Sequence, residues 1–234
     1  MPERRCSMRL NLSPTAPRSH ITVSENNKKM GVSILSFSTP AVKSCPRGLP
    51  CYMACYAKAY EDKRDSVHKS YINNMEMLKK YPDEVENKLV GVINLIGCKY
   101  FRFSVSGDVA IDPERPYLYV NLIINVAKRC KNTYFLAFSK SDLWNDMKIP
   151  KNLNIVYSSW LDWHVFNPTD RKGRNKFPTT NVISKKDVRD GMNICPNCLN
   201  KNILCENCHH CWHMKPADEP ILFIAHGIHR NKIK

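Results

Sequence analysis

The stretch YFRFSVSGDVAIDPERPYLYVNLIINVAKRCKNTYFLAFS (residues 100–139) decides the fold class of this chain. It begins with an apolar run typical of a buried strand (100–105) and ends with a second such run (133–139). Between these runs, residues 116–130 have the almost continuous apolar face of a helix that packs on a sheet. A strand, a helix and a strand in this order predict a βαβ unit with parallel strands.

The same alternation continues on both sides of that stretch. Further strands are predicted from apolar runs at residues 30–39, 152–159, 179–184 and 219–227. Further helices are predicted from apolar spacing at residues 55–81 and 82–97, and a short helical turn at 141–148. About six strands that alternate with helices indicate an α/β protein. We expect either an open parallel sheet of the doubly wound kind or a partial (βα)6-type barrel, because the strands are too few for a full (βα)8 barrel.

The domain organisation follows from the composition of the chain. Residues 1–29 are polar and rich in Ser, Pro and Asn, so we expect a flexible N-terminal arm there. Residues 30–234 are expected to form a single α/β domain with a cysteine-rich insert at 195–211 near the C-terminus. No apolar run approaches the ~20 residues that cross a bilayer, and the first residues lack the apolar core of a secretory signal. A cytoplasmic location is therefore expected, where clustered thiols bind metals more often than they form disulfides.

The charge of the chain predicts an anionic partner. Lys and Arg number 36 against 21 Asp and Glu, which gives a formal net charge of +15. This excess predicts attraction to nucleic acid, or to a nucleotide or other small anionic substrate. Basic residues are spread along the chain, with the densest run at 170–176, so a generally solvated basic surface is the alternative. Neither a G-x-G-x-x-G nor a P-loop motif occurs, and the usual nucleotide-phosphate folds lose support.

Three cysteines form a first cysteine group, Cys45, Cys51 and Cys55, in the loop after the first predicted strand. Three thiolates on a 4Fe-4S cluster leave one iron without a protein ligand, where a substrate or a cofactor can bind. The helix after Cys55 would place its positive N-terminal end near the negative charge of the cluster. A zinc site completed by a distant His or by Cys6 is one alternative, and a redox disulfide is another.

A second cysteine group contains five cysteines at residues 195–211. As C-x2-C-x6-C-x2-C it is similar to a small zinc ribbon. As a C-x2-C-x2-C run with a cysteine upstream it is similar to the ligand run of a 4Fe-4S ferredoxin. The three cysteines at spacing two favour the cluster, with zinc as the alternative. The predicted ligands are Cys195, Cys205, Cys208 and Cys211, which leaves Cys198 as the spare thiol.

Polar residues follow several of the predicted strands. In parallel α/β architectures the carboxyl ends of the strands carry the chemistry. We therefore predict a cofactor-binding edge close to the first cysteine group, formed by Ser106, Gly107, Asp108, Ser139, Lys140, Ser158 and Ser159.

A three-cysteine loop after the first strand and a Gly-acidic turn after the second, in about six βα units, resemble the radical S-adenosylmethionine (radical SAM) superfamily. The resemblance lies in architecture and order, since the usual loop of that superfamily is C-x3-C-x2-C. It implies a TIM-barrel-like enzyme that binds S-adenosylmethionine at the open iron. The superfamily has a turn that supports the methionine amino group, and Ser106, Gly107 and Asp108 stand in its place, with Asp108 holding the amine.

More closely, the chain resembles the bacteriophage gene product 88 family. The shared motifs span residues ~45–212 and read here as Cys45-Pro46…Cys51…Cys55-Tyr56-Ala57, Arg102-Phe103 through Asp108, Phe138-Ser139-Lys140-Ser141, and Cys205 to Trp212. The resemblance implies a phage protein located in the cytoplasm of the host cell. It implies no reaction.

Three functions are compatible with these features. The first is a radical SAM-like enzyme with two 4Fe-4S clusters that acts on an unknown, nucleic-acid-related substrate. The second is an iron–sulfur redox or sensor protein without that chemistry. The third is a zinc-containing, basic, nucleic-acid-binding phage protein. We rank them in this order.

Overall fold

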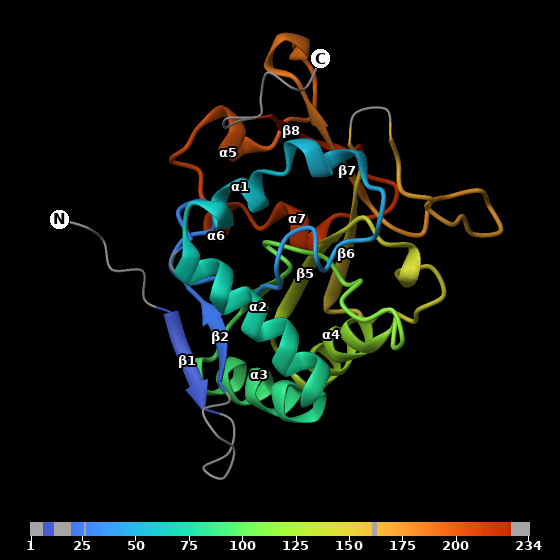
Figure 1. Ribbon diagram of the computed structural model, residues 1–234. Coiled ribbons are helices and arrows are strands. Elements are labelled where there is room, and N and C mark those ends of the chain that lie inside the picture. Colours follow the sequence, from blue (N-terminus) through green and yellow to red (C-terminus); the bar gives the residue numbers. More distant parts are fainter. Residues whose placement is uncertain (1–6, 12–19, 26, 161–162, 226–234) are drawn as a thin grey trace.

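The strands of the computed structural model form one eight-stranded sheet, whose strand order is the order along the chain (Figure 1). The structure describes residues 7–11, 20–25, 27–160 and 163–225. The strands are β1 (Ser7–Asn11), β2 (His20–Ser24), β3 (Leu35–Phe37), β4 (Tyr100–Phe103), β5 (Tyr134–Ser139), β6 (Leu153–Ser158), β7 (Thr179–Ile183) and β8 (Ile221–Ile224).

Strands β3 to β8 pair in parallel, which confirms the predicted α/β class and its six alternating strands. The sheet is open and is not closed into a barrel. Since neighbouring strands are also neighbours along the chain, the strand order shows no reversal of the kind found in a doubly wound sheet. The carboxyl ends of all six strands therefore follow one another along one edge.

Helices occupy the connections between strands. Between β3 and β4 lie the 3₁₀ turn η1 (Pro50–Ala54) and the helices α1 (Tyr56–Asp62), α2 (Asp65–Lys80) and α3 (Pro82–Ile96). Later connections carry α4 (Leu118–Arg129), η2 (Asp142–Trp144), η3 (Lys185–Asp187), α5 (Pro196–Leu199), α6 (Cys205–Cys208) and α7 (His210–His213). The helix predicted over residues 55–81 is broken, because Arg64 before α2 has the non-helical angles φ −142° and ψ 82°.

The N-terminal segment differs from the expected flexible arm over residues 1–29. β1 and β2 pair antiparallel and add a hairpin to the edge of the sheet. Ile21 and Val23 of β2 are buried, and the side chain of Asn74 in α2 bonds the backbone N–H and C=O of Thr22. The polar composition of the segment obscured two core residues at alternate positions of a short strand.

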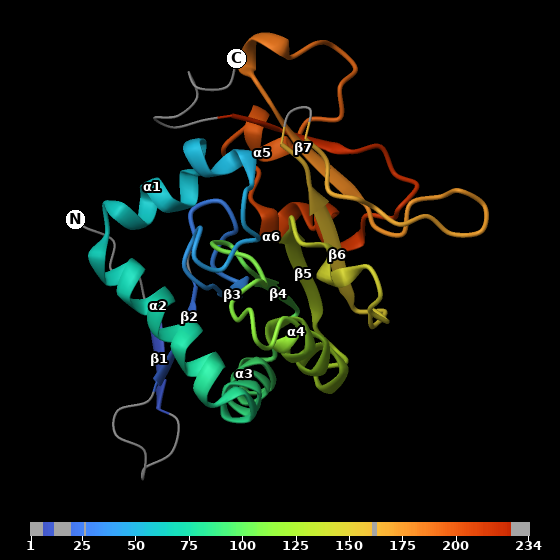
Figure 2. The same ribbon diagram turned by 45° about the vertical axis from the view of Figure 1, so that its right-hand side comes forward.

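The sheet separates two apolar clusters. One cluster joins strand residues such as Phe101 and Phe135 to α2, α3 and α4. The other joins Leu136 and Val156 to the segment of α5–α7, through residues that include Trp212. Figure 2 shows α3 and α4 on one side of the sheet and α5 and α6 on the other. Among the described residues no helix is long and apolar enough to cross a membrane.

Candidate metal centres

The first cysteine group lies between β3 and α1, at the carboxyl edge of the sheet. Cys45, Cys51 and Cys55 are partly exposed free thiols. Burial raises the pKa of Cys45, and the charges of Asp108, Cys55 and Cys51 raise it further. Ionisation of any one of these thiols is therefore opposed by the charge of the others. The loop presents them as one group.

The turn after β4 supports this loop directly. The Ser44 hydroxyl accepts hydrogen bonds from the Asp108 N–H (3.1 Å) and from the Thr39 hydroxyl (2.9 Å). The same hydroxyl donates to the carbonyl oxygen of Pro40 (2.7 Å). Gly107 has a φ of +75°, and a Cβ atom there would lie 2.2 Å from the Ser44 oxygen. The close approach of the two segments therefore requires glycine.

Asp108 ties the ends of β4 and β5 together. Its carboxylate is buried and accepts hydrogen bonds from the Val109 N–H (2.8 Å), the Ser139 hydroxyl (2.6 Å) and the Lys140 N–H (2.6 Å). Burial raises the pKa of Asp108, while these three donors lower it. The structure thus brings Asp108, Ser139 and Lys140 together at one edge, behind the cysteine loop.

Lys140 is a half-buried residue beside the first cysteine group. Its ammonium donates to the Ser158 hydroxyl (2.7 Å) and to the Ser158 carbonyl oxygen. Burial lowers the pKa of Lys140, whereas the charges of Cys51 and Asp108 raise it. Ser159 is also buried and bonds through its N–H to the carbonyl oxygen of Thr180 in β7 (2.8 Å). Of the predicted edge residues, Ser158 is the one whose oxygen atoms accept hydrogen bonds from the Lys140 ammonium.

Glu61 is a further residue of this site that sequence reasoning missed. Its buried carboxylate accepts hydrogen bonds from the Ala41 N–H (2.9 Å) and the Ser106 hydroxyl, and it pairs with His68 Nδ1 (3.0 Å). Glu61 therefore connects α1, the start of the cysteine loop and the turn after β4. It stands in the charged run EDKRD (61–65), and nothing in that run distinguishes it from a solvated acid.

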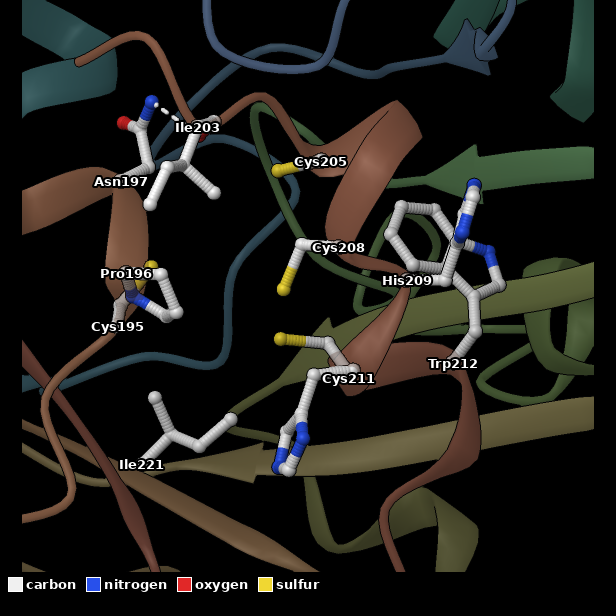
Figure 3. Close-up of a pocket in the computed structure, with 11 residues that line it drawn as sticks. Cys195, Pro196, Asn197, Ile203, Cys205, Cys208, His209, Cys211, Trp212 and Ile221 are labelled. Carbon is white, nitrogen blue, oxygen red and sulfur yellow. Dashed lines mark hydrogen bonds between the residues drawn. The ribbon is translucent and has the colours of Figure 1, made fainter. Parts of the chain in front are cut away.

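The second cysteine group surrounds a cavity between the α5 segment and the α6–α7 segment. Cys195, Cys205, Cys208 and Cys211 line it together with apolar residues such as Ile221 of β8. Figure 3 shows the sulfur atoms of Cys205, Cys208 and Cys211 turned toward the side of the cavity on which Cys195 lies. Four thiols from two segments of the chain thus line one cavity.

Cys198, the fifth thiol of this group, has a different environment from the four thiols at the cavity. Burial raises the pKa of Cys211 to about 12, and the thiolates of Cys195, Cys205 and Cys208 contribute to the shift. Cys198 does not line the cavity and instead shares a hydrogen bond with the Cys195 thiol. In this pair the shared hydrogen bond lowers the pKa of Cys195 and raises that of Cys198. The four thiols at the cavity are the four predicted ligands.

The segment before β3 holds α6 in place. The N–H groups of Cys205 and Glu206 donate to the carbonyl oxygens of Lys29 (3.0 Å) and Met30 (2.9 Å). The Glu206 carboxylate accepts from the N–H and the hydroxyl of Ser33, both at 2.9 Å. Gly31 has a φ of +94°, and a Cβ atom there would lie 1.9 Å from the Glu206 carboxyl carbon. The position of the Glu206 carboxylate beside Cys205 therefore depends on a glycine far away in the sequence.

The sheet holds α7. Trp212 Nε1 donates to the carbonyl oxygen of Phe101 in β4 (3.2 Å), and the Asn154 amide of β6 donates to the carbonyl oxygen of Cys211 (2.8 Å). His209 stacks on Tyr100 with ring centroids 3.8 Å apart. Figure 3 shows the His209 ring beside Trp212, and both residues belong to the lining of the cavity. Besides its sulfur atoms and apolar residues, the cavity is lined by Asn197, His209 and His210.

The model of the family described as gene product 88 matches residues 15–214. The chain belongs to the gene product 88 family. The matched range contains both cysteine groups and the edge residues from Ser106 to Ser159. Neither the curated proteins nor the solved structures that were searched include a match to the chain.

The donor set of this gene product 88 protein fits a thiolate-bound metal centre. Among the described residues no three His, Cys, Asp or Glu side chains already have the geometry of a bound metal ion. The cysteines in these ranges are nevertheless free thiols, and Cys6 lies outside the described residues. Lys140 faces the first group, and Arg102 and Lys29 lower the pKa of Cys205 in the second, where burial raises it. Neighbouring cations favour thiolates, the form that binds iron–sulfur clusters and zinc.

Proposed function

We propose that this member of the gene product 88 family is an iron–sulfur enzyme of the radical SAM type with two 4Fe-4S clusters. Cys45, Cys51 and Cys55 would hold the first cluster. The second would be held by Cys195, Cys205, Cys208 and Cys211. The observation that carries the proposal is that three free thiols lie beside a half-buried lysine at the carboxyl edge of six parallel strands in chain order. Three thiolates leave one iron open, which is what cofactor binding at a cluster requires.

A 4Fe-4S cluster with an open iron supplies the electron that cleaves the carbon–sulfur bond of bound S-adenosylmethionine. The residues of the chain would bind and orient that cofactor and exclude water. Asp108 Oδ2 accepts one hydrogen bond, from Lys140 N–H, and keeps one acceptor position for the cofactor's amino group. The Lys140 ammonium would attract the cofactor's carboxylate, and Ser158 and Ser159 would complete the pocket.

The substrate that best suits the chain is related to nucleic acid. The formal net charge of +15 favours a polyanion or a nucleotide, and the excess of basic residues is distributed over the chain. A phage protein with this activity would act in the cytoplasm of the host cell. The identity of the substrate does not follow from the cysteine groups, which supply the chemistry and not the recognition.

One observation favours a second candidate, an iron–sulfur redox or sensor protein that does not bind S-adenosylmethionine. The Asp108 carboxylate already accepts three hydrogen bonds within the protein, so it has a complete structural role without a cofactor. The third candidate, a zinc-containing nucleic-acid-binding protein, shares the basic charge and the same thiols. The three candidates differ in metal content and in their response to the cofactor.

The deciding experiment is anaerobic purification followed by absorption spectroscopy and assays of iron, sulfide and zinc. The proposal expects a brown protein with a broad band near ~400 nm and more iron than one cluster contains. The electron paramagnetic resonance spectrum of the reduced protein should change when S-adenosylmethionine is added. A spectrum that does not change when the cofactor is added favours the redox or sensor protein. A colourless protein with stoichiometric zinc favours the third candidate, the zinc-containing nucleic-acid-binding protein.

The variant Asp108→Ala sharpens this test. Loss of a carboxylate bonded to an ammonium group costs about 1.5–3 kcal/mol, so the cofactor concentration needed to change the spectrum should rise about tenfold or more. The iron content should remain that of the parent protein. Asp170→Ala is the matched control, because Asp170 pairs with Arg174 on an exposed loop and the cofactor response should stay the same.

A further inference from the structure

Arg102 of β4 carries a buried hydrogen-bond donor without an acceptor. Its Nε atom is buried and finds no hydrogen-bond partner in the described part of the chain. Its Nη1 atom reaches only the sulfur of Met30, at 4.0 Å, and the guanidinium lies over the ring of Phe138, 4.8 Å from the centroid. No carboxylate among the described residues forms an ion pair with it. Arg102 as a whole is half-buried, and a buried N–H group is costly unless an acceptor compensates it.

The surroundings of Arg102 belong to the second cysteine group. Arg102, Leu136 and Asn154 are paired in one row across β4, β5 and β6. Leu136 packs in the cluster that contains Cys195 and Trp212, and the Asn154 side chain bonds the backbone of Cys211. Arg102 therefore lies on the face of the sheet that α6 and α7 cover.

The electrostatics agree with this placement. Burial raises the pKa of Cys205, and the positive charge of Arg102 opposes that shift more than any other neighbour. Arg102 also opposes the rise in the pKa of Cys211. Lys29, whose ammonium lies 4.7 Å from the ring centroid of Phe223, adds a second positive charge. Cys205 and Cys211 thus lie in the field of Arg102, which has an unused N–H group.

We propose that Arg102 is the counter-ion of the metal centre in the second cysteine group and that its Nε–H donates a hydrogen bond to a sulfur atom of that centre. The inference rests on the proposed function for the existence of the centre. An oxidised 4Fe-4S cluster with four thiolates carries a charge of about −2, and reduction adds one more negative charge. A desolvated guanidinium stabilises the reduced form more than the oxidised form. Arg102 therefore raises the reduction potential of the cluster and helps to retain its iron.

The test is a redox titration of the full-length protein, followed by electron paramagnetic resonance. The signal of the second cluster is assigned as the one that survives in the Cys45→Ala, Cys51→Ala, Cys55→Ala triple variant. Arg102→Met, which keeps the length of the side chain and loses the charge, should lower the midpoint potential of this signal. Arg102→Lys should lower it less, because it restores the charge without the planar donor. If Arg102 acted through packing alone, the midpoint potentials of the two variants would not follow the charge of the side chain.

Iron retention gives a second measurement. Loss of one charge-assisted hydrogen bond corresponds to about a tenfold faster loss of iron from the second cluster to a chelator. Arg129→Met is the matched control, since Arg129 pairs with Glu86 on the helical surface and both measurements should match the parent. If Arg102→Met does not fold, Arg102→Lys provides the test, and its midpoint potential should be lowered by a smaller amount.

The outcomes separate this inference from the proposed function. An unchanged potential in the folded Arg102 variants, with iron present in the parent protein, overturns the role of Arg102 and leaves the two-cluster proposal standing. A parent protein whose second cysteine group holds zinc, or no metal, overturns both. A lower potential in Arg102→Met, partly restored in Arg102→Lys and absent in the control, supports the inference.

Discussion

The hydroxyl of Ser44 accepts a hydrogen bond of 3.1 Å from the backbone N–H of Asp108, although 64 positions separate the two residues. This contact joins the loop of the first cysteine group to the turn after β4. Because Gly107 precedes Asp108, the turn can approach the loop without a side chain between them. The geometry of Cys45, Cys51 and Cys55 therefore depends on a neighbouring strand as well as on their own spacing.

Gly107→Ala should displace the first cysteine group. The new Cβ atom would lie 2.2 Å from the Ser44 oxygen and 2.6 Å from the Thr39 carbonyl oxygen, so the loop must move. We expect loss of iron from the first cluster and retention of iron in the second, measured by iron assay and by electron paramagnetic resonance. Gly48→Ala is the matched control, with a φ of +74° and, among the described residues, open space around its Cβ position. Both variants carry a left-handed strain of about 1–2 kcal/mol, so equal iron contents would contradict the steric argument.

Gly31→Ala should affect the second cluster and not the first. Its Cβ atom would overlap the Glu206 carboxyl group, which lies beside Cys205 in α6. The second cluster should lose iron while the first keeps its response to the cofactor. Gly173→Ala, with a φ of +72° and open space around it, should keep both clusters. Iron per chain and the two spectroscopic signals provide the measurement, and a loss confined to the first cluster would refute the anchoring role of residues 29–33.

Glu61→Ala should destabilise the protein and loosen the first cysteine group. The change leaves the buried N–H of Ala41 and hydroxyl of Ser106 without their acceptor, at a cost of about 1–3 kcal/mol. Asp62→Ala is the adjacent control, because Asp62 is exposed and pairs with Lys58, a contact worth less than about 1 kcal/mol. Chemical denaturation measures the free energy of unfolding. Equal losses in the two variants would mean that Glu61 is not a tie between these segments.

Replacing the two cysteine groups separately should show two independent centres. The change of Cys45, Cys51 and Cys55 to Ala should remove about half of the iron and leave the second cluster intact. The same change at Cys205, Cys208 and Cys211 should damage folding more, because metal binding there would hold together short helices with few apolar contacts of their own. Circular dichroism and iron assays follow the two effects. Complete iron loss in both triple variants would indicate one shared cluster.

Much of the fold could be predicted from local pattern. Residues 100–139 form β4, α4 and β5 as the alternation of apolar runs indicated, and the remaining parallel strands lie within the predicted ranges. Apolar periodicity reports which side of an element is buried, and this is sufficient to assign strands and helices. It was not sufficient for β2, whose buried Ile21 and Val23 alternate with polar residues over only five positions.

The sequence by itself determined the fold class, the family and the two cysteine groups, because these depend on residue type and on short spacings along the chain. Only the tertiary structure decided which thiols face a common cavity, which acid ties the cysteine loop down and which arginine has an unused donor. Glu61 and Arg102 look like ordinary charged residues in the sequence. Their roles arise from contacts across many positions of the chain, and a local pattern carries no information about which distant backbone groups and sulfur atoms will share a buried space.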